Sequence, residues 1–249
     1  MKKPEDKLQE LTNRLQVACS DNLVSVVLYG SAARDDFHER YSDVNLLAVF
    51  RDLGAPQIAA IAPVMRWWTQ DEKFTPPLTM TELELRESAD VFAIELLDIQ
   101  RMHKTLFGKD VVSEIRIPMN LHRVEVEHEL RTTLLRLRQH LLLHPDRQDE
   151  LRGVLAKSIG GVRTLLRHAL IAAGEEPGHE GSKTLERAGE TFGFDVAAIQ
   201  AVLALRSDPE HPANVSELYS SYMSAIGRVA HELDARVPKK HWQKVSSAV

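Results

Sequence analysis

The sequence predicts an α+β protein: a domain with a mixed β-sheet and flanking helices, residues 1–118, followed by an all-α helical bundle, residues 119–249. Two observations support this division. Short β-branched runs alternate with helical patterns up to about residue 110, whereas the apolar patterns after about residue 121 have helical periodicity. The change at Ile117-Pro118 is therefore the expected domain boundary.

The first elements predict a helix and two strands. Leucines recur at helical spacing within residues 6–18, which indicates an amphipathic helix. Two β-branched runs follow, at 24–29 and 44–50, and each is typical of a buried strand. Gly30 and Ser31 come directly after the first run and predict a tight turn there.

The rest of the first domain predicts further helices and a third strand. Pro63 should kink or divide the helix that begins near Pro56. The T-x-x-E sequence at 81–84 is typical of a capping box, in which the two side chains satisfy free amides at a helix start. The apolar run 91–97 is the third strand candidate, with Asp98 capping a helix that Gly108 ends.

The second domain is predicted to contain only helices. Proline-rich or glycine-containing breaks separate the helical patterns, and Gly193 is the expected stop of the third. The predicted helices span residues 124–143, 148–174, 182–192, 197–205 and 215–235.

Composition limits the class of protein. A formal charge of -5 and a pI near 6.1 make nucleic acid an unlikely main partner. No run approaches the roughly 20 apolar residues of a membrane span, so we expect no membrane partner and a cytoplasmic location. Cys19 is the single cysteine and has no partner for an internal disulfide. A homodimer is compatible with these features.

The segment after the first strand carries the chemistry. Residues two apart in a strand point to the same side, so Asp43 and Asn45 project two oxygen-bearing side chains from one face. Gly30 permits a tight turn, and the amides from Ser31 onward attract phosphate at a helix start. Glu95 lies within an apolar run, where a carboxylate is costly unless it is paired or coordinated, and is the candidate third ligand.

These residues, in "YGSAARDDFHERYSDVNLLAV", resemble the nucleotidyltransferase superfamily, which includes DNA polymerase beta, aminoglycoside nucleotidyltransferases and small bacterial nucleotidyltransferases of toxin-antitoxin pairs. That family has Gly-Ser after a strand, an Asp-x-Asp strand further on and a third carboxylate on a later strand. The resemblance implies that Gly30, Ser31 and Arg34 bind the nucleotide. It also implies that Asp43, Asn45 and Glu95 form the catalytic, Mg²⁺-binding site. The likeness covers roughly the first 110 residues and extends to the helical remainder only in type.

Asn45 departs from the family pattern, which has its second aspartate there. An amide oxygen can ligate a hard cation but supplies no charge to hold it, so the metal site should be weakened. The expected activity is transfer of a nucleoside monophosphate from an NTP, with ATP the expected donor, to a hydroxyl of a small molecule or protein. The acceptor is not specified, and the general base is not selected among Glu125, Glu127 and Glu129.

Two other functions stay open as alternatives. Asn45 favours a catalytically weakened nucleotide-binding or protein-interaction module of the same fold. The Arg-x4-His spacing of Arg163 and His168, nearly repeated at Arg138 and His144, resembles the ribonuclease motif of helical toxins. Such spacings arise easily in helices rich in arginine and histidine, and solvated helix faces explain them well.

Overall fold

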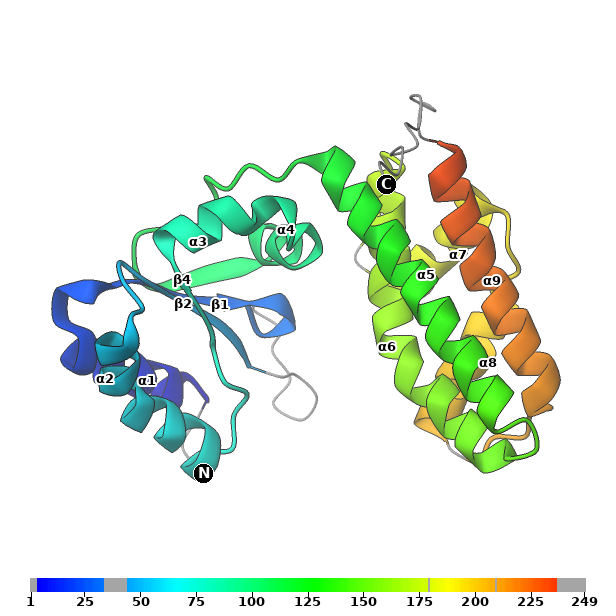
Figure 1. The fold of residues 1–249 in the computed structure, drawn as a ribbon, viewed down its shortest axis with the longest axis horizontal. Helices are drawn as coiled ribbons and strands as arrows, with labels where there is room; N and C mark the ends of the chain where they lie inside the picture. Colours follow the sequence, from blue (N-terminus) through cyan, green and yellow to red (C-terminus); the bar gives the residue numbers. More distant parts are fainter. Residues whose placement is uncertain (1–3, 34–43, 179, 209, 237–249) are drawn as a thin grey trace, which may run out of the picture. The chain divides into compact units, whose positions relative to one another are not determined.

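The computed structural model describes residues 4–33, 44–178, 180–208 and 210–236. Their contacts divide the chain into two compact units, Met1–Pro118 and Met119–Val249, which are called unit 1 and unit 2 below (Figure 1). The division lies where strand and helix patterns were expected to stop alternating. That each unit folds as an independent domain stays a prediction.

Within its described residues, unit 1 contains a four-stranded mixed sheet, with strand order β3-β2-β1-β4. Strand β1 pairs antiparallel with β2 and with β4, whereas β3 joins β2 in parallel. The mixed sheet and the helical unit 2 confirm the predicted α+β class. The strands are β1 (Leu23–Tyr29), β2 (Asn45–Phe50), β3 (Leu78–Thr81) and β4 (His103–Gly108).

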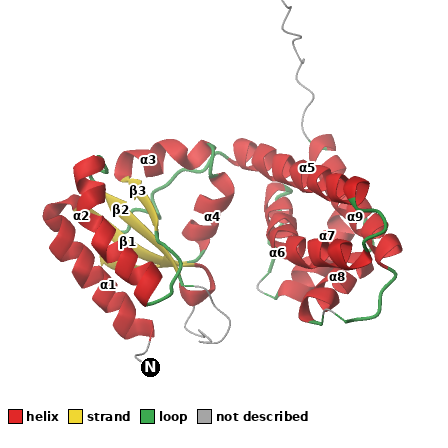
Figure 2. Cartoon of the chain, turned by 60° about the horizontal axis from the view of Figure 1, so that its bottom comes forward, coloured by secondary structure: helices red, strands yellow, loops and turns green. Residues whose placement is uncertain are grey.

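Helices cover both faces of this sheet (Figure 2). Successive side chains of β1 and β2 point to opposite faces of the sheet, so each strand contributes residues to two apolar clusters. Val26 and Leu28 pack with residues of α1 (Pro4–Cys19) and α2 (Ala55–Arg66) on one face. Val27 and Leu47 pack on the other face with residues of the helices α3 and α4. Those two helices are Glu82–Glu87 and Ala93–Arg101.

The helix was predicted to be kinked or divided at Pro63, and it is not divided there. Helix α2 continues through Pro63 to Arg66 and passes into the π-helical segment η3 (Trp67–Asp71). A wider turn of this kind accommodates a perturbed hydrogen-bond ladder without ending the helix. Trp68 lies in η3 and is fully buried.

The predicted third strand, 91–97, is wrong. That segment follows the short 3₁₀ turn η4 (Ser88–Asp90), and from Ala93 onward it belongs to α4. Its buried side chains follow helical spacing and cover the sheet, an alternative that a short apolar run does not exclude. Asp98 is therefore inside a helix instead of capping one, and Gly108 ends strand β4 instead of a helix.

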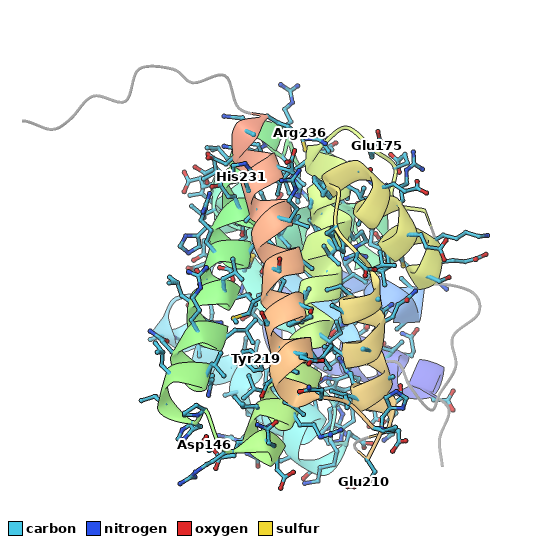
Figure 3. All side chains as sticks on the ribbon, turned by 90° about the vertical axis from the view of Figure 1, so that its right-hand side faces the viewer. Asp146, Glu175, Glu210, Tyr219, His231 and Arg236 are labelled. Atoms are coloured by element: carbon cyan, nitrogen blue, oxygen red, sulfur yellow. The ribbon has the colours of Figure 1, made fainter. Side chains whose placement is uncertain are left out.

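Unit 2 consists of five helices within the described residues, at the predicted positions. Asn214 caps α9 by accepting from Glu217 N, and Gly193 ends α7 in the left-handed region at φ 67°. Figure 3 shows α9 in front, with Tyr219 in its lower half and Arg236 at its upper end. Among the helices that the structure describes, none is long and apolar enough to cross a membrane. The five are α5 (Met119–Leu143), α6 (Gln148–Ala172), α7 (Gly181–Phe192), α8 (Ala197–Ser207) and α9 (Val215–Ala235).

Candidate functional site at the end of strand β1

Three strands meet where β1 ends. Tyr29, the last residue of β1, pairs with Asn45 of β2 on one side and with His103 of β4 on the other. The next residue, Gly30, opens the turn η2 (Gly30–Ala33) and donates its N–H to Met102 O at 3.0 Å. The predicted phosphate-binding turn is thus held by a backbone hydrogen bond just before the start of β4.

Gly30 and Asn45 lie against each other at this edge. Gly30 has φ +75°, a conformation that glycine adopts without strain. A Cβ built on Gly30 would lie 3.5 Å from Asn45 Nδ2. Asn45 is half-buried and shares a strand face with Leu47, so it lies on the side of the sheet that α3 and α4 cover. The structure therefore brings together two of the predicted site residues.

Glu95 reaches the same region from a helix. It lies in the first turn of α4, on the exposed side of that helix, and not on a strand as predicted. Burial raises the pKa of Tyr29, and the nearby Glu95 carboxylate raises that pKa further. Tyr29 packs with the cluster on the α3 and α4 side of the sheet, which is also the side of Asn45. The Glu95 carboxylate is therefore close enough to Tyr29 for its charge to act on that side chain, although the element that carries Glu95 was misassigned.

Two of the predicted residues, Arg34 and Asp43, lie outside the described residues. Ser31 is described only by its backbone, which follows Gly30 in η2. The proposed roles of these three side chains stay predictions.

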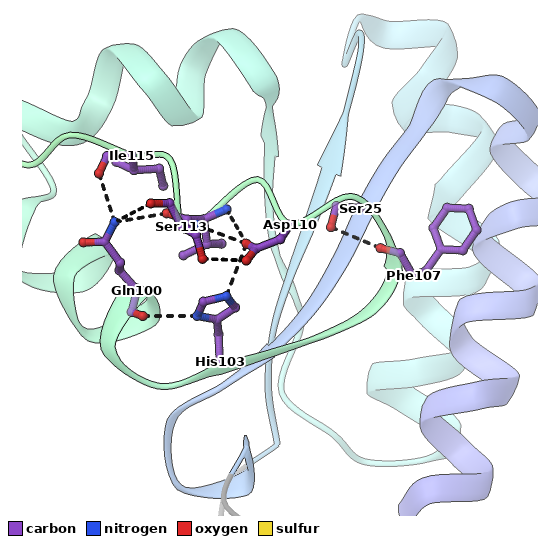
Figure 4. A network of polar contacts seen from close by, with 8 residues as sticks. Ser25, Gln100, His103, Phe107, Asp110, Ser113 and Ile115 are labelled. Carbon is purple, nitrogen blue, oxygen red and sulfur yellow. Dashed lines mark hydrogen bonds and ion pairs between the residues drawn. The ribbon is translucent and has the colours of Figure 1, made fainter.

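Tyr29 and His103 were missed by sequence reasoning. Tyr29 directly precedes Gly30, which was an available signal, but His103 follows a segment whose structure was predicted wrongly. In the structure His103 Nε2 lies 3.2 Å from Asp110 Oδ1, and Nδ1 lies 3.2 Å from Gln100 O (Figure 4). Hydrogen bonds to Asp110, first from the Ser113 side chain, lower the pKa of that carboxyl to about 2. This network holds the loop after β4 against the end of α4.

The side-chain oxygens at the end of β1 suit a hard cation, but they supply little negative charge. Mg²⁺ prefers carboxylate oxygens, and it accepts neutral amide oxygens. Asn45 offers an amide and Glu95 a carboxylate, whereas β3 carries no acidic residue. Among residues 4–33, 44–178, 180–208 and 210–236, no group of three or more His, Cys, Asp or Glu side chains could hold a metal. Asp43 would add the second carboxylate.

Comparison with known proteins finds a solved structure with a similar fold. The mixed sheet followed by a helical unit is an arrangement shared with a nucleotidyltransferase of known structure. That structure is spectinomycin adenyltransferase AAD(9) from Enterococcus faecialis, crystallised with ATP and spectinomycin. It matches with a TM-score of 0.54 and 14% identity over 93% of this chain and 100% of the other. No protein-family model and no curated protein matches the sequence.

One histidine of the two Arg-His pairs that suggested a ribonuclease is buried and does not lie in an open site. His168 is fully buried in α6, and its Nδ1 lies 2.8 Å from Nε2 of His122, which is also fully buried. Two buried rings in contact between α5 and α6 indicate a packing role in unit 2.

Proposed function

We propose that this chain is a magnesium-dependent nucleotidyltransferase with a metal site weakened by Asn45. It would transfer a nucleoside monophosphate from ATP or another NTP to a hydroxyl of a small molecule or a protein. The observation that carries the proposal is the Gly30 turn beside Asn45, at the edge of a sheet whose fold is shared with an adenyltransferase crystallised with ATP.

In this proposal each group at the edge has a separate task. The turn from Gly30 to Ser31 offers backbone N–H groups to the terminal phosphates of the nucleotide. Asp43, Asn45 and Glu95 would hold Mg²⁺, which supplies charge stabilisation to the phosphoryl group when bound. Asn45 leaves the site one negative charge short, so turnover should be slow compared with a site that has two paired aspartates.

A second candidate is a nucleotide-binding module that does not turn its nucleotide over. It is favoured by the neutral Asn45 and by the exposed position of Glu95 on α4. Both functions require nucleotide binding at the Gly30 edge, and they differ in whether pyrophosphate is released.

The test is calorimetric titration of ATP in Mg²⁺ into the wild-type protein and into Asp43→Ala. We expect binding by the wild type and a loss of at least roughly tenfold in affinity for the variant. Asp6→Ala is the matched control, because Asp6 is an exposed aspartate on α1. Absence of ATP binding by the wild type would refute both candidate functions.

Pyrophosphate release then separates the two functions. Release by the wild type in the presence of hydroxyl acceptors, and its loss in Asp43→Ala, would support the transferase. Binding without release, together with release by Asn45→Asp, would support the module, since the added carboxylate supplies the missing metal ligand.

A further inference from the structure

The Asn45 amide presents its nitrogen to the phosphate-binding turn. Nδ2 lies 3.5 Å from the point that a Cβ on Gly30 would occupy, and no other atom of the described residues lies within 4 Å of that point apart from Gly30 and its chain neighbours. The amide oxygen is therefore more than 4 Å from that point, whereas the nitrogen is 3.5 Å from it.

Nitrogen and oxygen of an amide serve different ligands. The NH₂ group is a donor and suits a phosphate oxygen, whereas the carbonyl oxygen is an acceptor and suits a cation. Gly30 is held in place by its N–H bond to Met102 O at 3.0 Å, and Asn45 is held by its strand pairing with Tyr29. The donor is thus positioned on a residue that is paired within the sheet.

We propose that Asn45 binds the nucleotide's phosphates directly, as a hydrogen-bond donor through Nδ2, and that this role outweighs its contribution as a metal ligand. This inference rests on the proposed function. An aspartate in the same position would repel the phosphates unless a cation lay between them. An asparagine removes that repulsion and adds a hydrogen-bond donor, so nucleotide binding depends less on the metal. Phosphate binding at this edge should therefore persist without Mg²⁺.

The experiment measures the Kd of ATP by calorimetry in EDTA and in Mg²⁺, for the wild type and for Asn45→Asp. The variant keeps the shape of the side chain and exchanges the donor for a charged acceptor. In EDTA we expect the variant to bind roughly tenfold more weakly or worse, because a hydrogen bond to a charged group is replaced by repulsion. In Mg²⁺ the deficit should shrink or reverse, because the new carboxylate binds the ion.

Asn13→Asp is the matched control. Asn13 is exposed on α1, where it accepts a hydrogen bond from Gln9, and it receives the same added charge away from the site. Its affinities should equal those of the wild type in both buffers. Circular dichroism checks the fold of each variant. Should Asn45→Asp unfold, Asn45→Ala tests the same point in EDTA, because it removes the donor without adding a charge.

The outcomes separate this inference from the proposed function. ATP binding by the wild type only in Mg²⁺ would overturn the inference and leave the proposed function standing. The inference would also be overturned if Asn45→Asp lost less than about fivefold in ATP affinity in EDTA, or lost as much affinity in Mg²⁺ as in EDTA. No binding by the wild type in either buffer would overturn both. A loss of about fivefold or more that is confined to EDTA, or larger there than in Mg²⁺, would support the inference.

Discussion

His103 and Asp110 join the first residue of β4 to the loop that follows this strand, with Nε2 of the imidazole 3.2 Å from Oδ1 of the carboxylate. Asp110 also accepts the backbone N–H groups of Val112 at 3.0 Å and Ser113 at 3.1 Å. One carboxylate therefore closes the loop and holds the strand that borders the Gly30 edge. Its ionisation should be linked to the stability of unit 1.

Asp110→Asn should lower stability at neutral pH by about 1 kcal/mol, after allowance for the 42% exposure of this side chain. The pKa of Asp110 falls from 3.8 to about 2 in the folded chain, so its contribution is full above pH 3.8 and is lost as the pH falls through about 2. Urea unfolding should show that the difference in unfolding free energy between the wild type and the variant becomes smaller from pH 7 to pH 3. A gap that stays constant with pH would contradict the prediction.

Trp68→Ala should cost about 3–5 kcal/mol of unfolding free energy. The Trp68 ring is fully buried and stacks on Phe74 at 4.2 Å, and its Nε1 donates to Thr75 O at 2.8 Å. Trp67→Ala is the control and should cost less, because Trp67 is only half-buried. Denaturant unfolding followed by circular dichroism measures both. Equal losses would contradict a core role for Trp68.

Gly108→Ala should destabilise the protein by roughly 3 kcal/mol. Gly108 has φ +76°, and an added Cβ would lie 2.0 Å from Val24 O, a backbone atom of the neighbouring strand. Gly153→Ala in α6 is the opposite case, since nothing lies within 4 Å of its added Cβ, and it should stabilise by about 0.5–1 kcal/mol. Thermal unfolding of the two variants should shift in opposite directions, and a shift in the same direction would refute the backbone argument.

Tyr219 should make unit 2 sensitive to alkaline pH. Its hydroxyl donates to Leu137 O at 2.8 Å, and burial raises its pKa to about 12. The stability that depends on the protonated phenol is full below the ordinary pKa of 10.0 and is lost as the pH rises through about 12. Tyr219→Phe should cost about 1 kcal/mol at neutral pH and lose less stability between pH 10 and pH 12. Parallel stability curves over that range would contradict this assignment.

Glu95→Gln should lower the pKa of Tyr29, because it removes the nearby negative charge while burial remains. Titration by nuclear magnetic resonance of labelled tyrosine resolves Tyr29 from the other three tyrosines. Glu87→Gln is the control, since Glu87 is an exposed glutamate at the end of α3. An unchanged Tyr29 pKa in Glu95→Gln would place the Glu95 carboxylate away from the Gly30 edge.

Local signals predicted much of the fold correctly. The capping box of Thr81 and Glu84 forms as expected, and Gly193 ends its helix with positive φ. These features depend on hydrogen bonds within four residues, or on the conformational freedom of one residue, so neighbouring sequence is enough to specify them. The helices of unit 2 were predicted for the same reason, because apolar spacing along each helix records its buried face.

In parts of the segment 78–108 local sequence signals did not predict the secondary structure correctly. "VFAIELL" is apolar and partly β-branched, which suits a strand, yet it packs as α4 with Leu96 and Ile99 against the sheet. Strands β3 and β4 are short and depend on pairing with β2 and β1, which are distant in sequence. A pairing partner of this kind leaves no mark in the strand's own residues.

The candidate site divides in the same way. The sequence by itself determined its chemistry: a glycine turn after a buried strand, an asparagine at the start of the next strand and a glutamate further on. Only the tertiary structure decided that the Asn45 nitrogen faces Gly30, that Glu95 comes from a helix beside Tyr29, and that Met102 and His103 hold the turn from the other side. The reason is that residue type sets which bonds a side chain can form, whereas strand register and helix packing set which groups it meets.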